Sequence, residues 1–272
     1  MTLLSVRVDV SDHVAEVTLL GPGKGNAMGP DLWRELPVVF GELDADPEVR
    51  AVVLTGSGAH FSYGLDLPAM MPTWGEVLAE GALAAPRTRF LEEIRALQGA
   101  VTAVATCRKP VVAAISGWCI GAGLDVIAAA DIRVASADAR FSLREVKVAI
   151  VADLGSLQRL VGVIGEGHLR ELALTGKDID AERALRIGLV NDVFPDQEAA
   201  LASARTMAAE IAANPPLAVQ GTKDVLGHER ERRVADGLRY VAAWNAAFLP
   251  SKDLGEAVQA FLERRPPEFT GQ

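Results

Sequence analysis

Over its first two thirds, the chain alternates short apolar runs with longer stretches of helical periodicity, and this alternation limits the fold more than any other feature. Each run is compact and apolar, so each predicts a buried strand. The runs are residues 50–55, 110–115, 132–135 and 189–194. Buried strands interleaved with helices imply βα crossover units and sheets covered by helices. The predicted fold class is therefore α/β.

The last third has a different pattern, because three segments of helical periodicity follow one another without a strand. These segments are residues 201–213, 233–248 and 251–264. Pro215-Pro216 separates the first from the second. We expect residues 1–200 to form the α/β core with the functional site, and residues 201–272 to form an appended helical region. Residues 70–86 are rich in Ala, Gly, Met and Pro, which predicts a mobile loop or a loose helix.

Charge and cysteine content exclude several classes of function. The chain has 27 Lys and Arg against 36 Asp and Glu, a net charge of −9, which disfavours a nucleic-acid partner. Cys107 and Cys119 are too few for a disulfide framework or a four-ligand zinc site, and four scattered histidines give no metal-ligand spacing. We find no signal peptide, no membrane-length apolar run and no peroxisomal or ER address at the C-terminus, so we expect a cytoplasmic protein.

Two glycine-rich segments resemble nucleotide-binding loops, but each fails at a defining position. Lys24, within residues 21–26, is not followed by the Ser or Thr that a phosphate loop requires. Gly121-Ala122-Gly123 follows a predicted strand, yet the third glycine of a dinucleotide fingerprint would fall on Val126. A nucleotide cofactor is therefore disfavoured, and no other cofactor is expected.

The segment around Gly121-Ala122-Gly123 suits a different chemistry. An apolar helix starts near Leu124, and the first N–H groups of a helix are unpaired and favour negative charge. Small residues also let a ligand oxygen approach the main chain. The turn therefore predicts half of an oxyanion hole, and residues 61–67 predict the other half. The alternative interpretation is that both segments are ordinary strand-to-helix turns, which are common in α/β folds and which local chemistry alone favours.

Four stretches in order carry a resemblance that covers nearly the whole chain. They are residues 25–28, 60–67, 113–125 and 130–135. Together they resemble the crotonase (enoyl-CoA hydratase/isomerase) superfamily. The resemblance implies a spiral of ββα units, a C-terminal helical region that builds trimers, usually paired into hexamers, and a thioester substrate carried on coenzyme A. It also implies that the N–H groups of Leu65 and Ala122 bind the thioester oxygen. Ala122 replaces a glycine of most relatives, which changes little because only the main-chain N–H is needed.

Further contacts to the acyl-CoA substrate are implied by the same resemblance. They come from Asn26, Ala27, Tyr63, Gly64, Asp66, Leu67 and Gly121. The C-terminal helices carry apolar stripes that include Val234, Leu238, Val241 and Phe248. Such stripes pack either within the chain or, as the resemblance implies, against neighbouring subunits.

Three carboxylates stand out because of their apolar surroundings. Asp125 lies in the first turn of an apolar helix, where it could simply complement the helix N-terminus. Glu145 continues the buried face of a predicted strand through Phe141 and Leu143, and a carboxylate on such a face needs a partner or a function. Asp153 precedes a predicted helix and could be its N-cap. Each acid therefore has a structural and a catalytic interpretation.

The order Asp, Glu, Asp at these positions resembles the delta(3,5)-delta(2,4)-dienoyl-CoA isomerases, whereas ordinary hydratases have Glu, Glu and Gly there. Residues 152–160, 218–223 and 243–245 agree with that subfamily. Shifting two conjugated double bonds toward a thioester removes a proton from C2 and adds one at C6, which needs two carboxylates. We assign Glu145 to C2 and Asp153 to C6, although these roles could be exchanged, and Asp125 to tuning the pair.

Two rival functions remain open at this point. A hydratase or a 3,2-enoyl-CoA isomerase on the same scaffold would use Asp125 and Glu145 and would need Asp153 only as a helix cap. A non-catalytic acyl-CoA-binding scaffold would bind the thioester and assemble into oligomers without turnover.

Overall fold

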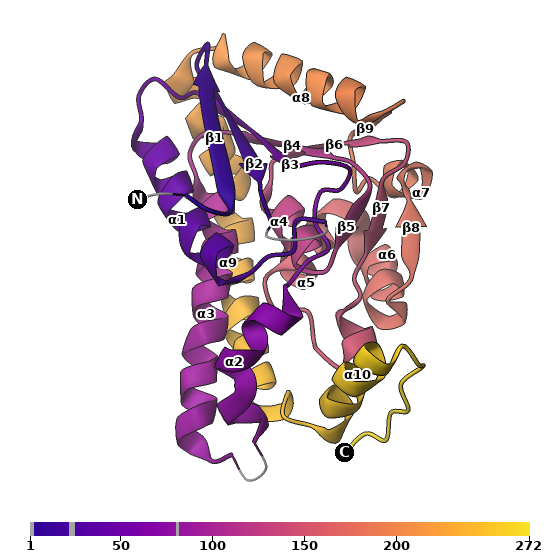
Figure 1. The fold of residues 1–272 in the computed structure, drawn as a ribbon. Helices are drawn as coiled ribbons and strands as arrows, with labels where there is room; N and C mark the ends of the chain where they lie inside the picture. Colours follow the sequence, from indigo (N-terminus) through magenta and orange to yellow (C-terminus); the bar gives the residue numbers. More distant parts are fainter. Residues whose placement is uncertain (1–2, 22–24, 80–81) are drawn as a thin grey trace.

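Within residues 3–21, 25–79 and 82–272, the part of the chain that the computed structural model describes, a six-stranded sheet forms the frame (Figure 1). Its strand order is β1-β2-β3-β4-β6-β9. The first two strands form an antiparallel hairpin, and every later neighbour is parallel. The strands are β1 (Val6–Ser11), β2 (Val14–Leu19), β3 (Ala51–Gly56), β4 (Val111–Ile115), β6 (Ile132–Ser136) and β9 (Asp192–Phe194). This parallel sheet confirms the predicted α/β class.

A second, three-stranded sheet has the order β5-β7-β8 among the described residues. Its strands are β5 (Trp118–Ile120), β7 (Arg140–Ser142) and β8 (Asp178–Asp180). Strand β5 follows β4 after a turn at Ser116-Gly117, so the chain passes from the large sheet directly into the small one. The turn into helix α4 (Ala122–Ala129) then begins at the end of β5.

Alternating side chains of the large sheet enter two separate apolar layers. Val53 of β3 and Val112 of β4 pack beneath helix α8 (Gln197–Ala212) through its buried alanines, such as Ala208. Figure 1 shows α8 lying across the upper edge of the molecule, over this face. Val52 and Leu54 point to the opposite face, into the main core. Helix α8, which crosses the predicted boundary at residue 200, therefore covers this face of the sheet.

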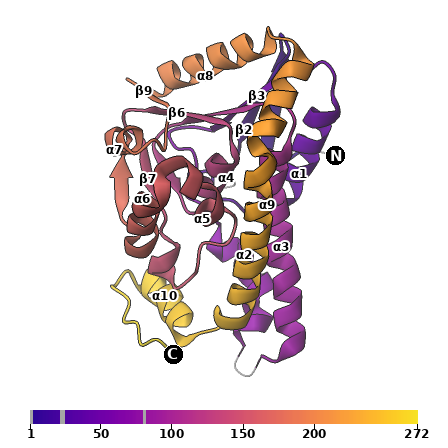
Figure 2. The ribbon, with the colours of Figure 1, turned by 180° about the vertical axis from the view of Figure 1, so that it is seen from behind.

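Long helices flank the main core on one side. Helix α9 (Pro216–Phe248) runs beside α3 (Ala84–Thr106) over much of the length of the molecule (Figure 2). Helix α10 (Lys252–Glu263) then returns to contact the short 3-10 helix η1 (Glu145–Val148). The remaining helices are α1 (Pro30–Ala45), α2 (Leu67–Leu78), α5 (Ser156–Arg159), α6 (Val161–Thr175) and α7 (Ala181–Arg186). The division at residue 200 into a core and an oligomerisation region stays a prediction.

The structure corrects three predicted boundaries. Residues 70–86, predicted as a mobile loop or loose helix, contain most of helix α2. Asp66 caps this helix, and Pro68 lies in its first turn. Residues 80–81 of the predicted segment lie outside the described residues. The strand predicted from residue 189 begins only at Asp192, where pairing with β6 starts. The helix predicted from residue 233 begins at Pro216. The prediction missed its first half, because exposed apolar residues such as Leu217 hide the helical periodicity there.

Two leucine truncations of the same chemistry test where the core lies. Leu54 in β3 is completely buried, whereas Leu174 on α6 is 71% exposed. We expect Leu54→Ala to lower the free energy of unfolding by about 2–5 kcal/mol, because it removes buried methyl groups and leaves a cavity. Leu174→Ala should change it by less than about 0.5 kcal/mol. Equal effects of the two in urea unfolding would contradict this placement of the core.

Candidate active site

Residues 61–65 lie against strand β5, and this contact joins two turns that are distant in the sequence. The N–H of Ser62 donates to the carbonyl of Trp118 over 2.9 Å. The N–H of Ile120 donates back to the carbonyl of Ser62 over 3.0 Å. The turn after β3 therefore lies directly beside the turn that begins helix α4.

Gly64 allows the two turns to touch. Its φ is +84°, and a Cβ there would lie 2.6 Å from Ile120 O and 3.3 Å from Ala122 N, so only glycine fits without moving the backbone. The N–H groups of Leu65 and Ala122 donate to no group in the described part of the chain. Two free N–H groups in adjacent turns can stabilise an oxyanion.

Asn26 holds the first of these turns in place. It is 5% exposed and has a φ of +51°. Its Nδ2 group donates to three main-chain carbonyls, those of Ser57 (2.7 Å), His60 (2.7 Å) and Phe61 (3.2 Å). Its own carbonyl accepts from Ser62 Oγ over 2.8 Å. The side-chain amide and the main-chain carbonyl of Asn26 therefore both bind the loop.

The other predicted substrate contacts surround this loop. Tyr63 is 38% exposed, and its hydroxyl lies 3.1 Å from Nε2 of His60. Asp66 is the N-cap of α2, where its Oδ1 accepts a main-chain N–H over 3.1 Å. Ala27 and Leu67 are half-buried. The carboxylate of Asp66 thus has a structural role that sequence spacing did not show.

Glu145 is not on a strand, which corrects the sequence prediction. Strand β7 ends at Ser142, because both of its neighbours end their pairing there. Phe141 and Leu143 are buried as predicted, but the chain then turns into η1, whose first residue is Glu145. Helix η1 turns the carboxyl group of Glu145 back toward Gly121. The two residues are so close that a Cβ atom added to Gly121 would lie 3.4 Å from Oε1 of Glu145. The carboxyl group therefore lies beside the turn that carries the N–H of Ala122.

The carboxyl group of Glu145 is shielded although the residue as a whole is half-buried. Its Oε2 is closed to solvent and has no hydrogen-bond partner among the described residues. Most buried polar atoms in proteins are paired, and an unpaired carboxylate oxygen is costly. Oε2 of Glu145 therefore has hydrogen-bonding capacity that no described residue uses.

Asp125 is 1% exposed and lies in the first turn of α4. Its Oδ1 accepts the N–H of Ser156 over 2.6 Å, at the start of helix α5. Asp125 thus pairs with the N-terminus of a different helix from its own. This contact fixes the segment that carries Asp153 close to Asp125.

Asp153 is not the N-cap of the helix that follows it. The N-cap of α5 is Gly155, and Oδ2 of Asp153 accepts from Nδ2 of Asn245 over 2.7 Å. Asn245 is on helix α9, far away in the sequence. The structural interpretation of Asp153 as a helix cap is therefore wrong.

Burial dominates the electrostatics of the three acids. It raises the pKa of Glu145 to about 8, with further increases from the charges of Asp125 and Asp153. It raises the pKa of Asp153 to about 7, although the hydrogen bond from Asn245 opposes the shift. It raises the pKa of Asp125 to about 6, against hydrogen bonds from Ser156. All three carboxyl groups therefore exchange protons nearer neutral pH than ordinary carboxyls do.

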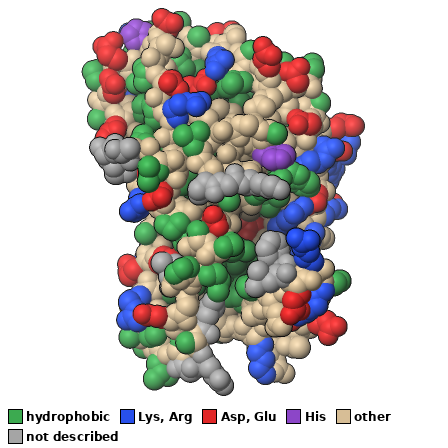
Figure 3. Space-filling model, viewed as in Figure 1, with side chains coloured by type: hydrophobic (Ala, Val, Ile, Leu, Met, Phe, Trp, Pro, Cys, Tyr) green, Lys and Arg blue, Asp and Glu red, His purple; other side chains and the backbone are tan. Residues whose placement is uncertain are grey.

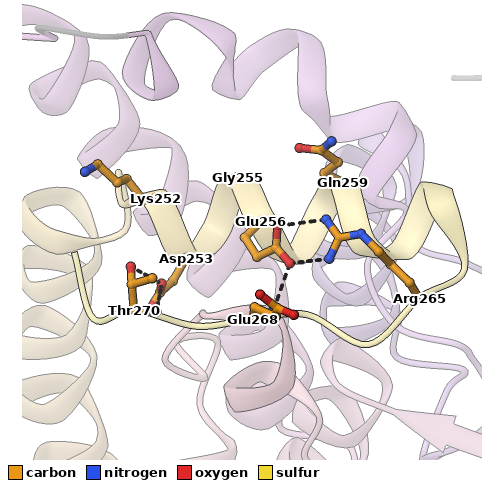
Figure 4. A pocket seen from close by; sticks show the side chains of 8 residues that line it. All are labelled: Lys252, Asp253, Gly255, Glu256, Gln259, Arg265, Glu268 and Thr270. Atoms are coloured by element: carbon orange, nitrogen blue, oxygen red, sulfur yellow. Dashed lines mark hydrogen bonds and ion pairs between the residues drawn. The ribbon is translucent and has the colours of Figure 1, made fainter.

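The surface is hollowed on the face seen in Figure 3, where hydrophobic side chains gather below the middle of the molecule. A separate hollow of about 610 Å³ lies along α10, and charged residues such as Lys252, Glu256 and Arg265 line it (Figure 4). There the C-terminal tail folds back on α10, since Glu256 pairs with Arg265 and Asp253 accepts from Thr270. This second hollow is lined by the tail and α10, and none of the three acids belongs to it.

The side-chain arrangement and the helices also bear on metal and membrane binding. Among the described residues, no group of three or more His, Cys, Asp and Glu side chains is arranged to hold a metal ion. No helix in the same part of the chain is both long and apolar enough to cross a membrane.

Comparison with known proteins gives the family. The profile of the enoyl-CoA hydratase/isomerase family matches residues 9–272. The chain belongs to this enzyme family. It is 43% identical, over 95% of its own length and 88% of the relative, to the mitochondrial delta(3,5)-delta(2,4)-dienoyl-CoA isomerase of Dictyostelium discoideum. It is 42% identical to the peroxisomal enzyme of the same name from Arabidopsis thaliana, over 98% and 96% of the two chains.

A solved structure of an enoyl-CoA hydratase/isomerase from Pseudoalteromonas atlantica T6c shares the fold. Its TM-score is 0.85 at 27% identity, with 98% of this chain and 100% of the other covered. The predicted crotonase-type fold is therefore confirmed for this member of the enoyl-CoA hydratase/isomerase family.

Several residues of the site were not predicted from the sequence. Asn245 and Gln98 bind the Asp153 segment from helices α9 and α3, and Ser156 binds Asp125. For Asn245 a signal existed, because it continues the helical stripe of Leu238 and Val241 as a polar residue. Asn245 is buried in that stripe, whereas the predicted stripe residue Phe248 is 62% exposed.

The raised pKa of Glu145 predicts a pH-dependent gain in stability when its charge is removed. In the unfolded chain Glu145 has its ordinary pKa of 4.5, whereas in the folded protein its pKa is about 8. Between these pH values the unfolded chain loses this proton more readily, so the free energy of unfolding falls as the pH rises. We expect Glu145→Gln to raise the melting temperature relative to the wild type at about pH 9 and much less at about pH 4. The exposed Glu210→Gln is the control. A gain in melting temperature that did not grow with pH would contradict the raised pKa of Glu145.

Proposed function

We propose that this enzyme shifts the double bonds of a 3,5-dienoyl-CoA to give a 2,4-dienoyl-CoA, a step in the β-oxidation of unsaturated fatty acids. The observation that carries the proposal is that Asp125, Glu145 and Asp153 lie together with pKa values raised by burial, and that the N–H groups of the adjacent turns have no acceptor among the described residues. The 43% and 42% identity to dienoyl-CoA isomerases supports it.

In the proposed reaction, the reactive form of the pair has its one proton on Asp153, which is the less populated form because the pKa of Glu145 is the higher of the two. Ionised Glu145 then takes the proton from C2 of the substrate. The electron pair of that C–H bond moves through the conjugated system, and negative charge develops on the thioester oxygen. The N–H groups of Leu65 and Ala122 stabilise this charge. Asp153 then gives its proton to C6, which completes the shift without net change in protons.

Asp125 serves the pair electrostatically. Its charge raises the pKa of both Glu145 and Asp153, and the hydrogen bond from Ser156 favours its own ionised form. Asp125 therefore helps Glu145 and Asp153 to keep one proton between them. An ordered water between Asp125 and Glu145, as a hydratase needs, would compete with that role.

The binding part of the proposal follows the family. Coenzyme A enters as part of the substrate, contacted by the loop residues Asn26, Ala27, Tyr63, Gly64, Asp66 and Leu67 and by Gly121, and no separate cofactor is needed for the proton transfers. Apolar side chains exposed on α9, including Tyr240 and Trp244, support a trimer or a hexamer of two trimers as the working assembly. The compartment is proposed to be the cytoplasm, although the two relatives named above are mitochondrial and peroxisomal.

The proposed proton pair predicts a bell-shaped pH profile of kcat/KM. Below about pH 7 both carboxyls are protonated and no base remains; above about pH 8 both are ionised and no acid remains. Activity should therefore peak between these values, whichever of the two acids serves C2. A plateau extending to about pH 5 would contradict a proton shared by these two groups.

Single substitutions separate the isomerase from its rivals. We expect Glu145→Gln and Asp153→Asn each to lower the rate of 2,4-dienoyl-CoA formation by about 10²- to 10⁴-fold, because each removes one proton carrier. The absorbance of the conjugated product measures this. In heavy water, Asp153→Asn should still exchange the C2 proton, whereas Glu145→Gln should not.

The opposite exchange pattern would swap the two roles. Hydration of a 2-enoyl-CoA that persists in Asp153→Asn, with no dienoyl shift in the wild type, would make the enzyme a hydratase. Tight binding of the thioester without any turnover would instead support the non-catalytic acyl-CoA-binding scaffold.

A further inference from the structure

Asn245 is a buried amide on a helix that is otherwise largely exposed. It is 1% exposed, whereas its neighbour Trp244 is 43% exposed and Phe248, one turn later, is 62% exposed. Burying an amide is unfavourable unless its hydrogen bonds are made. Its contacts therefore indicate what this position does.

Both contacts of the Asn245 amide go to the segment that carries Asp153. Nδ2 donates to Val151 O over 2.9 Å and to Asp153 Oδ2 over 2.7 Å. An amide group has two N–H donors, so these two bonds use both and fix the carboxyl group relative to its own main chain. Among the described residues, Asn245 is the one other residue whose side chain donates to this carboxyl group, and its bond goes to Oδ2; the N–H of Asp153 itself also favours the ionised form.

A second amide, that of Gln98 on α3, holds the same segment in a different way. Its Nε2 donates to Asp153 O over 2.8 Å and to Leu238 O over 3.0 Å. Gln98 therefore binds the main chain of Asp153 without touching the carboxyl group. Gln98 thus fixes the main chain of Asp153, and Asn245 fixes its carboxyl group.

We propose that Asn245 is a positioning residue for the isomerisation, which holds Oδ2 of Asp153 so that Oδ1 alone exchanges a proton with the substrate. This inference rests on the proposed function of Asp153. When Oδ1 gives its proton to C6, a C–H bond forms and the carboxylate is left negative. The N–H of Asn245 already points at that carboxylate and stabilises it, as a donor to a charged acceptor does. No reorganisation of the amide is then needed during the step.

The near-isosteric Asn245→Leu tests the inference. We expect kcat to fall by about 10- to 100-fold with KM nearly unchanged, which is the usual effect of losing a hydrogen bond to a charged group. The acidic limb of the pH profile should move to higher pH, because the lost donor favoured the ionised form of Asp153. Asn245→Ser, which keeps a short donor, should recover part of both effects.

Gln98→Leu is the matched control, because it removes an amide from the same segment but none from the carboxyl group. It should lower the melting temperature and leave the acidic limb in place. An acidic limb that stays in place in Asn245→Leu, or that moves equally in Gln98→Leu, would overturn the positioning role.

An infrared titration separates this inference from the proposed function. The protonated carboxyl band that disappears in Asp153→Asn reports the pKa of Asp153 without any substrate. A higher midpoint in Asn245→Leu than in the wild type supports the inference, and an equal midpoint overturns it. Failure of the wild type to convert a 3,5-dienoyl-CoA would instead contradict the proposed function alone, since the infrared midpoint is independent of turnover.

Discussion

The burial of three carboxyl groups at one place is the constraint on which the rest of the site depends. Charged groups leave water only at a large cost, so each acid keeps a proton more tightly than usual or gains a donor. Asp125 has the N–H of Ser156, Asp153 has Asn245, and Glu145 keeps an oxygen with no partner in the described residues. Glu145, the acid with an unpaired oxygen, has the most strongly raised pKa of the three.

The main-chain half of the site depends on close backbone packing. Gly64 lets the turn after β3 approach the start of α4, and Asn26 holds that turn through three carbonyls. Gly64 and Asn26 fix where the N–H groups of Leu65 and Ala122 point, and preorganised N–H groups need no rearrangement when charge develops.

Much of the frame followed from the sequence because local patterns determine it. The apolar runs at residues 50–55, 110–115 and 132–135 are strands β3, β4 and β6, as their composition predicts. The failures lie where tertiary contacts decide the outcome. Glu145 leaves its strand because β5 and β8 stop pairing at Ser142, and the first half of α9 presents apolar residues such as Val225 outward. A pattern of apolar residues predicts burial, but it does not tell what covers each face.

The sequence by itself determined the α/β class and the family, and it singled out the three acids, because these depend on residue types in a fixed order along the chain. Only the tertiary structure decided that Asp153 is paired with Asn245 across the molecule and that Gly121 lies beside Glu145. The physical reason is that desolvation and hydrogen bonding act through space. Neither the pKa of a carboxyl nor the donor it receives can be calculated until the groups around it are in place.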